Sequence, residues 1–173
     1  MVVIMKRILI LVAVLPLLAL AACGGSTDHN DADVEFSQQM IPHHQQAIMM
    51  ADLVPGSDAS ADVVELAAQI KAAQDPEIQT MKGWLAQWGA SESAGQMDHG
   101  GMMSDEDMSS LMGISGPEFN QMWVTMMIEH HEGAVEMAQD VLATTSNPEV
   151  EKLATAVVQG QEKEITTMKG MLG

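Results

Sequence analysis

The sequence predicts an all-α fold, a four-helix bundle made of two tandem helical-hairpin repeats. A shift of 87 residues aligns residues 36–85 with residues 123–172, and 19 of these 50 positions are identical. Each copy contains two segments whose apolar residues recur with helical spacing, and no segment shows the alternation of a strand. Four helices joined by two short turns and one longer connection are typical of a bundle.

Residues 1–22 predict a lipoprotein signal peptide. Lys6 and Arg7 precede an apolar run that is shorter than the roughly 20 residues of a spanning helix. The segment from Leu20 to Cys23 resembles the lipobox of bacterial lipoproteins, which implies that Cys23 is acylated and becomes the mature N-terminus. We therefore expect a lipid-anchored protein at the cell membrane that faces the periplasm or the cell exterior. An ordinary signal peptide with an incidental cysteine is the alternative.

Changes in composition divide the mature chain. A segment rich in Gly, Ser, Met and Asp separates the two copies and is expected to be a linker. The expected division is a flexible tether (23–33) followed by a bundle (34–173), which consists of repeat one (34–88), a Met- and His-rich linker (89–114) and repeat two (115–173).

Repeat one is expected to begin with a helix capped by Asp31 or Asp33 and ending near Pro55. Ser60 then opens a second helix with apolar residues at helical spacing. Pro76 falls inside this helix and is expected to kink it, because proline removes one backbone donor and clashes with the preceding turn.

Repeat two follows the linker, in which we expect at most a short helix near 105–112. Ser115 and Glu118 fit a capping box at the start of its first helix. Residues 144–148 then form the turn into the final helix.

Composition and charge exclude several classes of function. With 7 Lys and Arg against 24 Asp and Glu, the chain carries a formal net charge of −17, which argues against nucleic-acid binding. A single cysteine excludes a disulfide framework and any site made of several thiolates. The unusual feature is the 17 methionines.

Both histidine pairs share the apolar side of their helices with methionines. At about 100° per residue, His43 and His44 lie within roughly 80° of Met40, and the second copy repeats this arc. Glu129, together with the glutamates that follow it, falls on the opposite side. The candidate metal ligands on the helices are Met40, His43, His44, Met50, Met126, Met127, His130, His131 and Met137.

Imidazole and thioether groups together form a soft, neutral set of ligands that suits Cu(I), whereas Mg²⁺, Ca²⁺ and Mn²⁺ require oxygen donors. We expect oxygen donors to be absent from this interior. The alternative for each methionine is ordinary core packing, because Met fills irregular gaps. That alternative is favoured for Met81 and Met168, which have no histidine neighbours.

The linker contains a second group of candidate ligands. Methionines in this segment have no core to fill, and Gly100-Gly101 would let them converge on one ion. The candidate ligands in the linker are Met97, His99, Met102 and Met103.

The pattern His-His-x-x-Ala-(Ile/Val)-x-Met-Ala, at 43–51 and again at 130–138, resembles the secreted CopM-like proteins of the domain-of-unknown-function family DUF305. The resemblance covers residues 34–172 and implies a ferritin-like four-helix fold. It also implies copper binding outside the cytoplasm in support of copper resistance. Carried over to this sequence, it implicates Met40, His43, His44, Met50, Met127, His130, His131 and Met137.

The sequence therefore predicts a copper-binding lipoprotein and not an enzyme. Sequestration, transfer to a partner protein and resistance all stay open as roles, as does a homo-oligomer. A ferritin-like di-iron oxidase is one alternative, but that chemistry requires inward glutamates where this chain has Met40 and Met127. The other alternative is a surface interaction module without metal, whose histidines are structural or sense pH.

Overall fold

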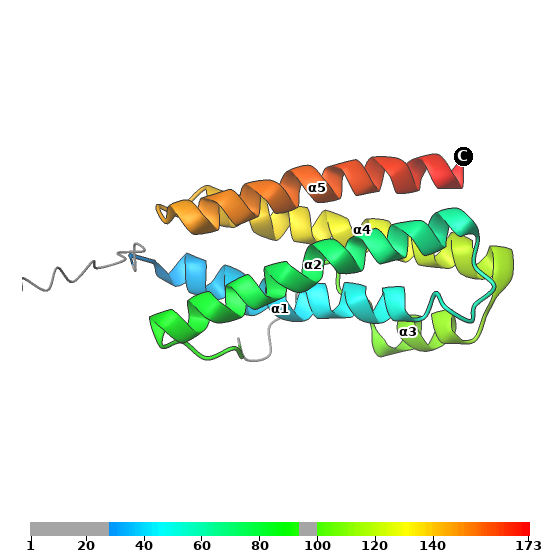
Figure 1. The fold of residues 1–173 in the computed structure, drawn as a ribbon, viewed down its shortest axis with the longest axis horizontal. Coiled ribbons are helices and arrows are strands. Elements are labelled where there is room, and N and C mark those ends of the chain that lie inside the picture. The colour runs from blue at the N-terminus through cyan, green and yellow to red at the C-terminus, as the bar shows by residue number, and fades with distance from the viewer. Residues whose placement is uncertain (1–27, 94–99) are drawn as a thin grey trace, which may run out of the picture.

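The computed structural model describes residues 28–93 and 100–173, and every regular element within these ranges is a helix. The chain folds into two antiparallel hairpins that lie side by side (Figure 1). The all-α prediction is confirmed. The predicted signal peptide, Cys23, Met97 and His99 lie outside the described residues. The helices are α1 (Asp31–Asp52), α2 (Ala61–Trp88), α3 (Asp105–Met112), α4 (Gly116–Leu142) and α5 (Pro148–Leu172).

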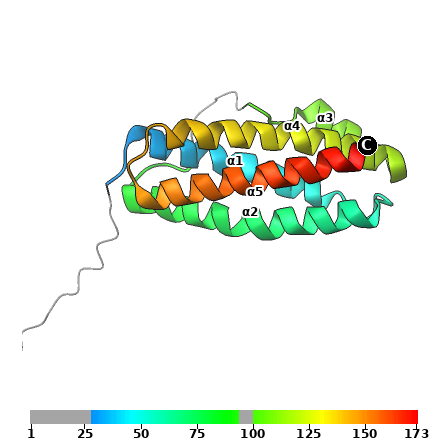
Figure 2. The ribbon, with the colours of Figure 1, turned by 90° about the horizontal axis from the view of Figure 1, so that it is seen from above.

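The sequence repeat determines how the hairpins pack. Helix α1 packs against α2, α4 packs against α5, and the two hairpins meet chiefly through α1 and α4. Figures 1 and 2 show that α1 and α4 run in opposite directions, so the copies are related by an approximate twofold axis between them. The short α3 lies outside the four long helices, beside α4. None of the helices in the described part of the chain is long and apolar enough to cross a membrane.

The residue that caps α1 differs from the expected one, whereas the residue that caps α2 is the expected one. Asn30, and not Asp31 or Asp33, caps α1, because its side chain accepts the Asp33 N–H while the Asp33 carboxylate accepts the Asn30 N–H. The helix therefore begins inside the segment expected to be a tether. Ser60 caps α2 as predicted, through the Val63 N–H.

The capping box predicted for Ser115 does not form. Its side chain makes no capping hydrogen bond, although Ser115 does precede the helix. Gly116 has a φ of +65°, a left-handed conformation, and its N–H donates to the Ser57 carbonyl oxygen. The first turn is therefore oriented by a contact with the α1–α2 loop.

Two prolines lie inside long helices. Pro76 falls within α2, which nevertheless continues as a single helix to Trp88. Pro42 falls within α1, directly before the first histidine pair. Each proline leaves the carbonyl four residues earlier without its usual helical donor.

A polar layer divides the core into two apolar clusters. One cluster contains Met50, Trp123 and Met127, and the other contains Phe36, Met40 and Trp84. Along every long helix, residues of one cluster are separated from those of the other by buried polar side chains. The members of this layer, which we call the polar layer, are His43, His44, Gln74, His130, His131 and Gln161.

Candidate metal centre

The four predicted histidines meet in the centre of the bundle and are fully buried. His43 of α1 and His130 of α4 lie at the approximate twofold axis, with ring centroids 3.8 Å apart and planes inclined by 38°. His131 follows on α4, with its ring centroid 6.3 Å from that of His130. The helical spacing correctly predicted this burial, because each pair lies on the apolar side of its helix.

The second histidine of each pair is bound to a glutamate of the neighbouring helix. Nε2 of His44 lies 2.8 Å from Oε2 of Glu77 on α2. Nε2 of His131 lies 2.7 Å from Oε2 of Glu164 on α5. In both pairs the histidine side chain is fully buried and the glutamate side chain is 20 % exposed. The expectation that oxygen donors are absent from this interior was therefore wrong.

Two glutamines complete the polar layer. Gln74 and Gln161 are buried, and Oε1 of each has no hydrogen-bond partner within the described residues. Sequence reasoning missed both glutamines and both glutamates. A signal was nevertheless available, since Gln74 and Glu77 align at the 87-residue offset with the identical residues Gln161 and Glu164.

Burial changes the acid–base behaviour of His130. The pKa of His130 is lowered from 6.5 to about 3, mainly by loss of solvation and further by the neighbouring His131 and His44, while a hydrogen bond with the His43 backbone opposes the shift. The imidazole of His130 is therefore neutral at physiological pH. A neutral imidazole has a lone pair available for a metal ion.

Methionine side chains border the polar layer on both sides. Met40 and Met127 are fully buried one turn before their histidine pairs, and Met126 is 6 % exposed. Met81 shares an apolar cluster with Met40, and Met168 shares the other cluster with Met127. Each half of the bundle thus brings two thioethers from neighbouring helices into one cluster.

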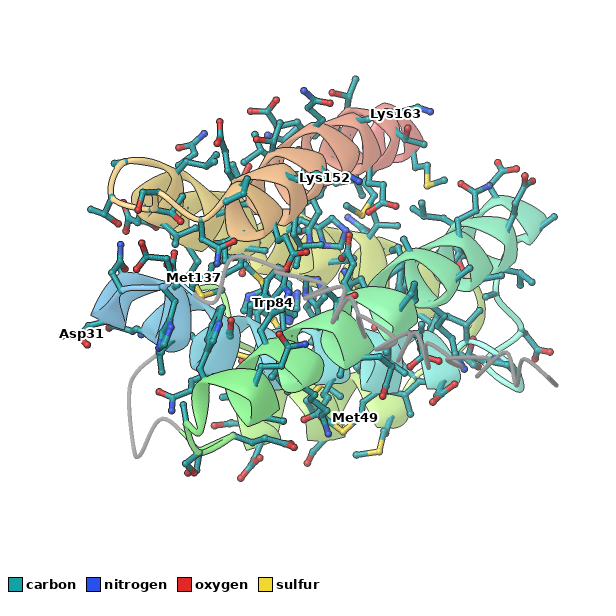
Figure 3. All side chains as sticks on the ribbon, turned by 60° about the vertical axis from the view of Figure 1, so that its left-hand side comes forward. Asp31, Met49, Trp84, Met137, Lys152 and Lys163 are labelled. Atoms are coloured by element: carbon teal, nitrogen blue, oxygen red, sulfur yellow. The ribbon has the colours of Figure 1, made fainter. Side chains whose placement is uncertain are left out.

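Met50 and Met137 lie farther from the histidines. Seven residues separate each from the first histidine of its pair, which is about 10 Å along a helix axis. Met50 is fully buried, and its carbonyl oxygen accepts the Trp123 indole N–H at 2.9 Å. Met137 is only partly buried, beside Phe36, at the edge between α1 and α4 (Figure 3). The two matching methionines therefore have different surroundings.

The end of the linker docks across α1 and α4, close to the polar layer. Met103 exchanges two hydrogen bonds with Gln46, donating its N–H at 2.7 Å and accepting the side-chain amide at 2.9 Å. Gly101 lies against the α4 backbone, where an added Cβ would come within 3.1 Å of the His130 carbonyl oxygen. Gly133 leaves the room for this approach, since a Cβ there would lie 2.2 Å from the Gly100 carbonyl oxygen. Met102 is partly buried beside them.

The donor set of this interior fits a soft metal ion. Nδ1 of His44 and Nδ1 of His131 are buried without a hydrogen-bond partner in the described part of the chain. Leaving such an atom unsatisfied costs about 1–3 kcal/mol, and a metal ion would satisfy it. Within residues 28–93 and 100–173, no group of three or more His, Cys, Asp and Glu is arranged to hold a metal. The thioethers beside the polar layer are further soft donors for such an ion.

The acidic residues on α4 face the solvent. Glu129, Glu132 and Glu136 are exposed, as their helical positions predicted, and Glu132 pairs with Lys169 of α5. These carboxylates are not ligands for the interior, but they add to a field that attracts cations to the surface.

Comparison with known proteins gives one family. The family model described as Domain of unknown function (DUF305) matches residues 33–172. A DUF305 protein from Streptomyces coelicolor, classed as secreted, is 30% identical with a TM-score of 0.78, covering 82% of this chain and 91% of that chain. A DUF305 fragment from Deinococcus radiodurans is 31% identical with a TM-score of 0.77, covering 83% of this chain and 97% of that chain.

A third similar structure contains metal. CopM in its Cu(II)-bound form is 32% identical with a TM-score of 0.71, covering 81% of this chain and 95% of that chain. CopM has also been solved in Cu(I)-bound and Ag-bound forms. No curated protein matches this chain.

Proposed function

The chain belongs to the DUF305 family, and from this premise we propose that it binds copper, as Cu(I), in the interior of its bundle. The observation that carries the proposal is the polar layer, in which four imidazoles are buried beside thioethers. The copper-bound and silver-bound forms of CopM support metal binding by a protein of this fold.

The proposed ligands come from both repeats. His43, His44, His130 and His131 supply nitrogen, and Met40 and Met127, fully buried one helical turn before each pair, are the predicted thioether ligands. Sulfur and neutral nitrogen favour Cu(I) over Fe(II), and thioethers stay competent in mild acid because they carry no proton to lose. Met50 and Met137 lie two turns away and would serve an ion only outside the polar layer.

The linker supplies a second, weaker place for copper in this proposal. Met102 and Met103 are partly buried at the surface over α1 and α4, and Met126 lies on α4. We place Met97 and His99 with them on the sequence alone. The partly buried thioethers of Met102 and Met103 would exchange an ion with the solvent faster than fully buried groups do, so this segment suits uptake and release.

We propose a binding protein and not an enzyme, acting outside the cytoplasm. The lipobox-like segment supports lipid anchoring through Cys23, and the secreted relative supports export. Such a protein would sequester Cu(I), hand it to a partner protein, or both, and thereby support copper resistance. Replacing Cys23 by Ser is expected to abolish incorporation of radiolabelled fatty acid, and unchanged labelling would contradict the anchor.

A competition titration tests the binding proposal. Wild-type protein, anaerobic and with a chromogenic Cu(I) chelator, is compared with the quadruple variant His43→Gln, His44→Gln, His130→Gln and His131→Gln. We expect the quadruple variant to lose about 100-fold or more in Cu(I) affinity, which equals about 2.7 kcal/mol. His29→Gln is the matched control, because His29 is exposed and stacks on Trp88. Equal affinity in the quadruple variant and the control would contradict a site in the polar layer.

A further inference from the structure

The second histidine of each pair differs from the first in what it contacts. His44 and His131 each place Nε2 within 2.8 Å of a glutamate oxygen, whereas no such carboxylate contact is found for His130 in the described part of the chain. The same contact forms twice, in two copies of the sequence that share 19 of 50 residues. The matching geometry shows that the contact belongs to the repeated unit, since both the histidine and the glutamate are identical in the two copies.

The chemistry of the carboxylate determines which histidine nitrogen carries the proton. An ionised carboxylate only accepts hydrogen bonds, so Nε2 of His44 and Nε2 of His131 must be the donors. In a neutral imidazole the other nitrogen then has no proton and presents a lone pair. That nitrogen is Nδ1, which in both residues is buried and has no hydrogen-bond partner within the described residues.

We infer that Glu77 and Glu164 are positioning residues that hold His44 and His131 as Nε2–H tautomers, so that both bind the metal through Nδ1. This inference rests on the proposed function and adds the donor atoms to it. A carboxylate behind a ligating imidazole fixes the ring orientation and increases the basicity of the ligating nitrogen. The glutamates reach the histidines from α2 and α5, so all four long helices contribute to the arrangement.

The contact that each glutamate makes with Nε2 favours a positioning role over direct ligation of the metal. Their side chains are 20 % exposed while the histidines are fully buried, so each carboxylate lies between its imidazole and the solvent. The buried Nδ1 is on the other side of the ring. A metal bound at Nδ1 would thus be separated from the carboxylate by the imidazole. The partly exposed carboxylate would keep its contact with Nε2, so no unpaired glutamate charge would be buried.

The first test needs no metal. In ¹⁵N-labelled, metal-free protein, long-range ¹H–¹⁵N correlation spectra distinguish the two tautomers of each histidine. We expect the Nε2–H form for His44 and His131 at neutral pH, and a shift towards a mixture of tautomers in the variant Glu77→Gln/Glu164→Gln, since an amide both donates and accepts. An Nδ1–H form in the wild type would overturn the inference, whatever the protein binds.

The second test measures affinity for Cu(I) alone, with the competing chelator used above. We expect Glu77→Gln/Glu164→Gln to bind Cu(I) about 10–100-fold more weakly than the wild type, as is typical when the outer partner of a metal ligand is removed. The matched control is Glu65→Gln/Glu162→Gln, which changes one exposed glutamate on each of the same helices. Equal affinity in the two double variants would overturn the positioning role while leaving the proposed function intact.

The third test identifies the donor atom with Ag(I), a diamagnetic d¹⁰ ion like Cu(I). On binding, the Nδ1 resonances of His44 and His131 should move while their Nε2–H protons persist. Displacement of the Nε2–H protons instead would contradict coordination through Nδ1. If neither Cu(I) nor Ag(I) binds the wild type, the proposed function and the donor assignment both fail, although the tautomers measured without metal still report whether the glutamates position the rings.

Discussion

At the scale of single residues, the buried histidines fall into two chemical classes. His44 and His131 are each held by a carboxylate, whereas His43 and His130 face each other across the approximate twofold axis. Two imidazolium ions cannot share a space in which ring centroids are 3.8 Å apart without strong repulsion. The folded state of the metal-free protein is therefore stable only while His43 and His130 are not both protonated.

The lowered pKa of His130 predicts how stability varies with pH. Unfolded protein would bind a proton on this residue below pH 6.5, whereas folded protein resists doing so until about pH 3. The contribution of His130 to stability is complete above pH 6.5 and is lost as the pH falls from 6.5 to about 3. Between these pH values the unfolded state binds up to one proton more than the folded state, so the free energy of unfolding changes by up to about 1.4 kcal/mol per pH unit.

Chemical denaturation of metal-free protein between pH 7 and pH 4 measures this slope. His130→Gln should reduce the dependence of the free energy of unfolding on pH, although the variant is less stable at every pH. His29→Gln, in which an exposed ring is replaced, should keep the dependence of the wild type. The same slope in all three proteins would show that His130 is not the titrating group.

Sulfur can be separated from packing by exchanging Met for Leu, which conserves volume. Met40→Leu/Met127→Leu should bind Cu(I) at least about 10-fold more weakly, a loss of about 1.4 kcal/mol. Its melting temperature should change little, because both side chains are fully buried among apolar residues. Met81→Leu/Met168→Leu is the matched control in the same clusters and should retain the affinity. Equal losses in both double variants would assign all four thioethers to the metal.

At the scale of elements, the linker is the feature that breaks the repeat. Gln46 and Gly133 are equivalent positions in the two copies, yet one binds the Met103 backbone and the other admits Gly100 and Gly101. Both repeats thus present the same face to the linker and use different residues there. Through these contacts, linker residues 100–103 cross from α4 to α1 next to the histidines.

Gly133→Ala should displace the linker from α4, because the new Cβ would lie 2.2 Å from a backbone oxygen. The Met103 amide, which donates to Gln46, should then exchange its hydrogen about 10-fold faster or more. Gly160→Ala is the control of opposite sign, since open space surrounds that position in α5. It should stabilise the protein by about 0.5–1 kcal/mol through helix propensity. An unchanged exchange rate of the Met103 amide in Gly133→Ala would contradict the docking.

Most of the elements could be predicted from the sequence, and their interactions could not. Apolar spacing and turn residues predicted all four long helices, because these signals are local, while the short α3 was expected only as a possibility within the linker. The predictions of helix caps were less accurate. Asn30 caps α1 in place of Asp31 or Asp33, and the capping box expected at Ser115 does not form where the Gly116 N–H donates to the Ser57 carbonyl oxygen. The outcome at Ser115 depended on residues distant in the sequence.

The difference between local signals and contacts of distant residues also explains which site residues could be predicted. Burial of the histidines follows from their own helix, so it was predictable. Their glutamate partners lie 33 residues further along the chain, on another helix, and only tertiary packing brings them together. Identity of Glu77 with Glu164 across the repeat was the available clue.

At the scale of the whole molecule, the duplicated hairpin produces a core with a polar centre. Two apolar clusters stabilise the bundle on either side, and the polar layer between them holds the buried imidazole and amide groups. The net charge of −17 surrounds this arrangement with a field that favours cations. Because the polar layer lies across α1 and α4, an ion bound there, as we propose, would join the two repeats directly.

Binding that joins the repeats should stabilise the whole fold. Free Cu(I) at 100 times its dissociation constant would add about 2.7 kcal/mol to the free energy of unfolding of the wild type. The quadruple His→Gln variant should show no comparable increase in melting temperature under the same conditions. A similar increase in both proteins would indicate that copper binds elsewhere.

The most direct measurement is anomalous diffraction from a crystal of the protein soaked with Cu(I), recorded on both sides of the copper absorption edge. We predict an anomalous peak inside the bundle between α1 and α4, within bonding distance of histidine nitrogen and methionine sulfur. Peaks only over the linker or elsewhere on the surface, with none in the polar layer, would contradict a buried copper site.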